Sequence, residues 1–126
     1  MDENLEQRVC IAILKQLDDK SNDVQSVAVK CLAMLLKRVQ PTQLGEICFK
    51  LCSLLLEGTN ELRDIYSIGL KNLISEAKEV NGALITLKAA PTLLRGINYT
   101  HSNTSMQDDI RKESVENMTE LLRRFG

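Results

Sequence analysis

The chain has 126 residues and a formal net charge of −1, with 44% hydrophobic, 26% charged and only 3% aromatic residues. A core of Leu, Ile, Val and Ala favours helix packing over a β-sandwich, which draws on aromatic residues. The lack of a basic excess argues against a nucleic-acid-binding protein. No apolar run approaches about 20 residues, and the acidic start Met1-Asp2-Glu3-Asn4 has no signal-peptide pattern, so we expect no membrane contact and a cytoplasmic or nuclear location.

Apolar residues recur at helical spacing in six segments. Helices are expected over about 4–18, 23–38, 41–57, 61–78, 83–97 and 106–124. Ser21 or Asn22 is expected to cap the second helix, Pro41 to open the third and Gly58 to end it. Pro91 should either kink the fifth helix or set its effective start. No segment alternates with period two, so the predicted fold class is all-α.

The helices form pairs whose sequences repeat. The second helix of each pair opens with an acidic, an aliphatic and a long polar residue: Asp23-Val24-Gln25, Glu61-Leu62-Arg63 and Asp109-Ile110-Arg111. At the same offset that separates Asp23 from Glu61, the first-helix residues Val9, Ile13 and Leu17 recur as Ile47, Leu51 and Leu55. A period near 40 with two helices per unit is typical of HEAT or armadillo repeats, and the chain has no room for armadillo's third helix.

The sequence therefore predicts one α-α superhelix over residues 1–126, made of three HEAT repeats at about 4–38, 41–78 and 83–124. In this architecture the first helices line the convex side and the second helices the concave side, where partners usually dock. A terminal repeat normally has a polar outer face, but the first helix is apolar on several sides, with Ile11 off its main face. We expect a preceding repeat or another chain to cover that end, and self-association through the terminal repeats is one alternative.

Nothing in the sequence indicates an enzyme, a metal site or a cofactor. Cys10, Cys31, Cys48 and Cys52 lie among apolar residues without a CxxC pair, so buried free thiols are favoured over zinc ligands. The single histidine, His101, falls in a polar loop. There is no Gly-rich phosphate loop and no pair of carboxylates in an apolar setting.

Three segments carry more than a generic repeat pattern: residues 14–20, 23–32 and 61–71. Residues 23–32 and 61–71 closely resemble the second and third repeats of the cullin-associated neddylation-dissociated (TIP120) family, and residues 14–20 look like the end of the preceding helix. The resemblance covers about residues 5–75, and from residue 83 onward it is mainly a matter of register. The family's first repeat and its many later repeats have no counterpart here. This chain would therefore be a fragment, one part of a split protein or a short relative.

The resemblance implies a non-enzymatic module that binds unneddylated cullin, at the cullin C-terminal region and its RING subunit, in the assembly of SCF-type ubiquitin ligases. Five polar residues of the second and fourth helices are not needed for the apolar stripe and lie in the family-like segments, so they are the candidate partner contacts: Gln25, Lys30, Arg63, Asp64 and Lys71. The alternative is that they are solvated, or that Arg63 and Asp64 link adjacent repeats.

Two other functions stay open on the sequence alone. One is a cytoskeletal or transport-type HEAT scaffold that binds tubulin or cargo, although the turns at 20–22 and 58–60 lack the aromatic residues usual in tubulin-binding repeats. The other is an inert structural fragment of a larger solenoid.

Overall fold

The computed structural model describes residues 3–36 and 40–126, and within these ranges the chain forms α-helices and short 3-10 turns without any β-strand. The elements are α1 (Glu3–Gln16), α2 (Asn22–Leu35), α3 (Pro41–Glu57), η1 (Asn60–Leu62), α4 (Arg63–Glu76), η2 (Glu79–Asn81), α5 (Gly82–Ile97) and α6 (Thr104–Phe125). The all-α prediction is confirmed.

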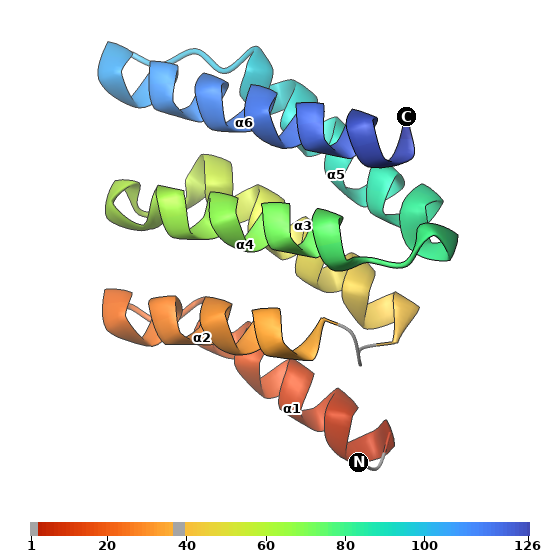
Figure 1. Cartoon of the computed structure of the whole chain (residues 1–126). Coiled ribbons are helices and arrows are strands. Elements are labelled where there is room, and N and C mark those ends of the chain that lie inside the picture. Colours follow the sequence, from red (N-terminus) through yellow and green to blue (C-terminus); the bar gives the residue numbers. More distant parts are fainter. Residues whose placement is uncertain (1–2, 37–39) are drawn as a thin grey trace.

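The helices lie in two layers (Figure 1). Helices α2, α4 and α6 lie side by side in one layer, and α1, α3 and α5 lie side by side behind them. Each odd-numbered helix packs on the even-numbered helix that follows it, and the pairs succeed one another along one direction. This side-by-side progression is that of a HEAT-like superhelix. The exact repeat boundaries stay a prediction of the sequence.

Most predicted helix ends lie close to the observed ones because local chemistry sets them. The Ser21 hydroxyl accepts a hydrogen bond from the Val24 amide at 3.4 Å, which caps α2. Pro41 is the first residue of α3, and the Gly58 amide closes that helix by donating to the Leu54 carbonyl at 2.7 Å. The predicted end of the second helix at 38 lies outside the described residues.

The alternative that Pro91 sets the start of the fifth helix is wrong. Helix α5 already begins at Gly82 and continues through Pro91 to Ile97. A proline inside a helix leaves the carbonyl four residues earlier, here that of Leu87, without its usual donor. Both Pro91 and Leu87 are exposed, so water can satisfy that carbonyl.

The core is a continuous apolar seam between the two layers. Its largest fully buried side chains come from α2 to α6 and from the turn after α1: Tyr66, Leu17, Leu32, Ile47, Leu51, Leu55, Leu70, Leu73, Ile74, Ile85, Leu93 and Ile110. Among the described residues, two buried hydrogen bonds cross between neighbouring helices of the layer formed by α2, α4 and α6. The Tyr66 hydroxyl of α4 donates to the Gln25 side chain of α2, and the Asn117 side-chain amide of α6 donates to the Ser67 hydroxyl of α4 at 2.9 Å.

Close helix approach explains Gly69 in the middle of α4. A Cβ atom at this position would lie 2.8 Å from Cγ1 of Val29 on α2, which is shorter than ordinary van der Waals contact. The missing side chain lets α2 and α4 pack closely, and this offsets the roughly 1 kcal/mol that glycine costs in a helix interior.

All four cysteines are free thiols, and Cys10, Cys48 and Cys52 are buried. Burial raises the pKa of the Cys10 thiol, and the nearby Glu46 carboxylate adds to this effect. The pKa of Cys52 is raised chiefly by its hydrogen bond with the Cys48 thiol and then by burial. The raised pKa values of Cys10 and Cys52 keep these two thiols protonated, which makes them poor nucleophiles and poor metal ligands.

Candidate protein-binding surface

Helix α4 defines an accessible side of its layer. It lies between α2 and α6 and packs against α3 behind it, so its exposed residues point to the one remaining side. These residues include Asp64, Ile68, Asn72 and Ser75, which recur every three or four positions and form one stripe. We call this side of the α2, α4 and α6 layer the open face.

The repeat register identifies the neighbouring residues of the open face. Aligning the helix starts at Asp23, Glu61 and Asp109 makes Ile68 correspond to Lys30 on α2 and Glu116 on α6. Asn72 likewise corresponds to Met34 on α2 and Glu120 on α6. All of these side chains are exposed or half-buried, so they form two rows across the three helices.

Two apolar side chains stand out among the charged residues of the open face. Ile68 is 57% exposed at the middle of the layer, and Met34 is 81% exposed on α2. Apolar side chains within a polar rim are typical of protein-binding surfaces, and methionine adapts its shape to a partner. The sequence prediction, which considered only polar residues, missed both. The repeat register could have indicated Ile68, because it places an aliphatic residue where α2 has Lys30.

Lys30 and Asp64 lie exposed on the open face, as the sequence prediction requires. Among the residues that the structure describes, neither makes an ion pair. Both side chains are therefore accessible to a partner, and their role as contacts stays a prediction.

Lys71 is half-buried and links two helices of the layer. Its ammonium nitrogen lies 2.9 Å from Oε2 of Glu116 and 4.0 Å from Oε2 of Glu113, both on α6. The hydrogen bond from Lys71 lowers the pKa of Glu116, and the positive charges of Lys71 and Lys112 add to that effect. Lys71 thus has a structural role at the α4–α6 boundary beside any contact with a partner.

Gln25 and Arg63 do not project from the surface. The sequence placed both residues off the apolar stripe, but they are only 7% and 3% exposed. The Gln25 amide donates to the Asp19 carbonyl at 2.7 Å and accepts from Tyr66. Arg63 donates from Nε to the Leu55 carbonyl at 3.1 Å and from Nη2 to the Asn60 side chain at 2.7 Å.

These contacts give Gln25 and Arg63 roles inside the chain. Gln25 links α2 to α4, and so connects two successive helix pairs. Arg63 binds the end of α3 and the turn after it, so it links two helices of one pair rather than adjacent repeats. We therefore leave both residues out of the binding surface.

The Lys71–Glu116 pair predicts a small pH dependence of stability. The pKa of Glu116 is lower in the folded chain than its unfolded value of about 4.3. The stabilisation is therefore present above about pH 4.3 and is lost as the pH falls through the folded value. Because both side chains are partly exposed, the pair should contribute less than about 1 kcal/mol.

The test is urea unfolding of the wild-type chain and Lys71→Met at neutral and at acidic pH. The variant should be the less stable at neutral pH, and the difference should shrink in acid, where Glu116 is protonated. A difference that stays the same at both pH values would show that Lys71 acts through packing alone.

The described residues contain neither a cluster of metal ligands nor a helix that could span a membrane. They hold no group of three or more His, Cys, Asp or Glu side chains that could bind a metal ion. In the same residues, no helix combines the length and apolarity needed to cross a bilayer. A stack of helical pairs with an accessible face of mixed apolar and charged residues defines the class of helical-repeat protein-binding modules.

Comparison with known proteins agrees with this class and gives the family. No protein-family model matches the chain. The chain is 36% identical over 128 residues to cullin-associated NEDD8-dissociated protein 1 of Drosophila melanogaster and 35% identical over 126 residues to that of Arabidopsis thaliana. It is 30% identical over 129 residues to cullin-associated NEDD8-dissociated protein 2 of Mus musculus.

Each of these alignments covers 100% of this chain but only 10% of the relative. The chain is thus a homologue of the N-terminal part of cullin-associated NEDD8-dissociated proteins, which confirms the family resemblance seen in the sequence. It spans about a tenth of the length of the curated relatives it matches.

Proposed function

We propose that this chain is a non-enzymatic module that binds a cullin through the open face of α2, α4 and α6. The names of its relatives, cullin-associated proteins, support the choice of partner. The observation that carries the choice of surface is Ile68, an aliphatic side chain 57% exposed at the middle of the face. Burying this aliphatic side chain against a partner would be favourable, whereas burying a lysine or an aspartate at the same place would not.

The family resemblance refines the proposed partner. It implies the C-terminal region of an unneddylated cullin together with its RING subunit, and a role in the assembly of cullin–RING ubiquitin ligases. Exchange of substrate receptors would be an activity of the whole relative, of which this chain corresponds to one tenth. We also propose a cytoplasmic or nuclear location, where reducing conditions keep thiols such as these four free.

The test compares two substitutions that place the same charge on exposed aliphatic positions. Ile68→Asp alters the centre of the open face, whereas Val80→Asp alters an 83% exposed residue of η2 away from it. Binding to an immobilised, unneddylated cullin–RING complex is measured by biolayer interferometry. Ile68→Asp should weaken binding at least about tenfold, which corresponds to about 1.4 kcal/mol, and Val80→Asp should leave it unchanged.

The proposal also requires that the wild-type chain binds the cullin–RING complex. Absence of binding at micromolar concentration would contradict the cullin proposal, and binding to tubulin in the same assay would favour the scaffold alternative. Equal weakening by both substitutions would keep the partner but reject the open face as its binding surface.

A further inference from the structure

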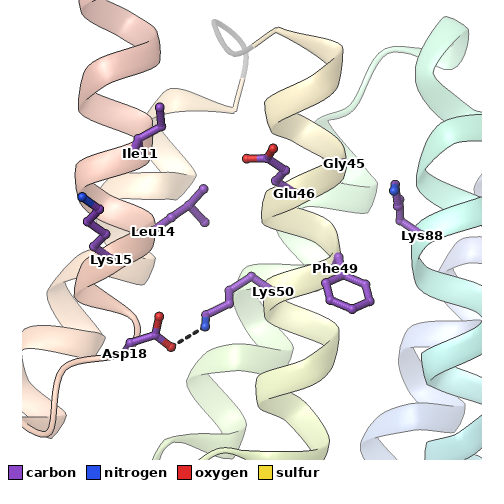
Figure 2. Close-up of a pocket in the computed structure, with 9 residues that line it drawn as sticks. All are labelled: Ile11, Leu14, Lys15, Asp18, Gly45, Glu46, Phe49, Lys50 and Lys88. Carbon is purple, nitrogen blue, oxygen red and sulfur yellow. Dashed lines mark hydrogen bonds and ion pairs between the residues drawn. The ribbon is translucent and has the colours of Figure 1, made fainter.

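Opposite the open face, the layer of α1, α3 and α5 also exposes apolar side chains. Helix α3 is the middle helix of this layer and packs on α4 behind it, so its exposed Phe49 points outward, as Figure 2 shows. At the offset that separates Asp23 from Glu61, the equivalent residues are Ile11 on α1 and Leu87 on α5. The side chains of Ile11, Phe49 and Leu87 are 48%, 54% and 70% exposed. We call this row the outer ridge.

A cavity of about 360 Å³ lies beside the outer ridge, between α1 and α3 (Figure 2). Ile11 and Leu14 contribute apolar surface from α1, and Phe49 contributes it from α3. Gly45 also lines the cavity, and a Cβ atom there would lie 3.6 Å from Cδ1 of Leu84 and from Cε of Lys88 on α5. The volume is at the lower end of the range of about 300–1,000 Å³ for ligand pockets, so it suits one or two side chains of a partner.

Charged residues surround the cavity, and the positive ones are in excess. Lys15, Lys50 and Lys88 line it together with Asp18 and Glu46. Lys50 forms an ion pair with Asp18, drawn in Figure 2. Among the described residues, neither Lys15 nor Lys88 forms an ion pair, and Glu46 is the one carboxylate of the cavity lining that is not paired with a lysine.

On α3 and α5, a lysine recurs at the position directly after the outer-ridge residue. Lys50 comes directly after Phe49 on α3, and Lys88 directly after Leu87 at the equivalent place on α5. Each of these two helices thus presents an outward apolar side chain with a lysine beside it. A partner that crosses α3 and α5 would meet an apolar contact and an ammonium group on both helices.

We propose that this outer surface binds an acidic amphipathic helical segment of another protein. An aliphatic or aromatic side chain of the segment would enter the cavity beside Phe49, and its carboxylates would pair with Lys15 and Lys88. Helices that bury an apolar face in a groove are a common mode of peptide recognition. The inference is independent of the cullin proposal, which concerns the opposite layer.

Two other occupants fit the charges less well. Two copies joined through their outer surfaces would bring lysine-flanked ridges against each other. An anionic membrane would attract the lysines, but it would be repelled by Asp18 and Glu46 within the same groove. An acidic segment is favoured because it can place its carboxylates at Lys15 and Lys88 and its apolar side chain between them.

The probe is a pair of fluorescein-labelled helical peptides of about 18 residues, long enough to be helical in water. One carries leucines on one face with flanking glutamates, and the other has lysines in place of the glutamates. Fluorescence anisotropy with the full chain should show saturable binding of the acidic peptide and binding at least about tenfold weaker for the basic one.

Substitutions then locate the site. Lys88→Glu and Phe49→Ser should each weaken the acidic peptide severalfold, whereas Ile68→Asp on the open face should leave it unchanged. Circular dichroism checks that each variant is folded. Lys88→Glu changes an exposed residue, so of the two substitutions it is the one less expected to disturb folding. Equal binding of both peptides, insensitivity to Lys88→Glu, or loss on Ile68→Asp would each overturn the proposal. So would binding to phosphatidylserine vesicles without binding to the acidic peptide.

Discussion

Replacing Tyr66 with alanine is expected to lower the free energy of unfolding by about 3–5 kcal/mol, the usual cost of removing a buried aromatic ring. Tyr66 is fully buried between the layers, and a Cβ atom at Gly58 would lie only 3.1 Å from its Cζ atom, so the ring packs tightly on the end of α3. Its hydroxyl also donates to Gln25 on α2, so the residue joins two successive helix pairs. Urea unfolding followed by far-ultraviolet circular dichroism measures the loss.

Tyr66→Phe is the matched control because it keeps the ring and removes only the hydrogen bond. It leaves the buried Gln25 oxygen without this donor, which should cost about 1–2 kcal/mol. If Tyr66→Ala cost no more than Tyr66→Phe, the ring would contribute nothing and the packing described for this seam would be wrong.

The second large effect concerns two glycines that look alike in the sequence but differ in their surroundings. Gly96 lies where α5 meets α6, and an added Cβ would be 2.8 Å from Cβ of Ser114 and 3.2 Å from Cδ1 of Leu56. Gly96→Ala should therefore destabilise the chain by about 1–3 kcal/mol through overpacking, although alanine is the better helix former.

Gly45→Ala should have the opposite sign. The nearest atoms to its added Cβ are Cδ1 of Leu84 and Cε of Lys88, both at 3.6 Å, an ordinary van der Waals separation. Without a clash, the gain in helix propensity should stabilise the chain by about 0.5–1 kcal/mol. Thermal unfolding of both variants should move the melting temperature in opposite directions, and a shift of the same sign for both would contradict the described helix contacts.

The helices and their pairing could be predicted from the sequence because they depend on local signals. Apolar spacing sets the buried faces, and Ser21, Pro41 and Gly58 set the helix ends through their own backbone chemistry. The repeated motifs at 23–25, 61–63 and 109–111 then showed that the same unit recurs. For Pro91 the same reasoning left two alternatives, a kink or a later helix start, because a proline breaks the hydrogen-bond pattern of a helix without always ending it.

The proposed binding surface could be predicted only in part, because exposure depends on which helices are neighbours. Gln25 and Arg63 look like surface residues, but each is drawn inward by a partner on another helix: Tyr66 of α4 for Gln25 and the Leu55 carbonyl of α3 for Arg63. Ile68 and Phe49 look like core residues, but each lies on a middle helix and points away from the seam. The repeat register carried part of that information, since equivalent positions in a solenoid face the same side.

The most direct test of the central claim is a methyl NMR titration of the chain with an unneddylated cullin–RING complex. If the open face is the binding surface, the methyl signals of Ile68 and Met34 should shift or broaden, and those of Ile11 and Leu87 on the outer ridge should stay unchanged. Changes confined to Ile11 and Leu87, or no change in any of the four signals, would contradict it.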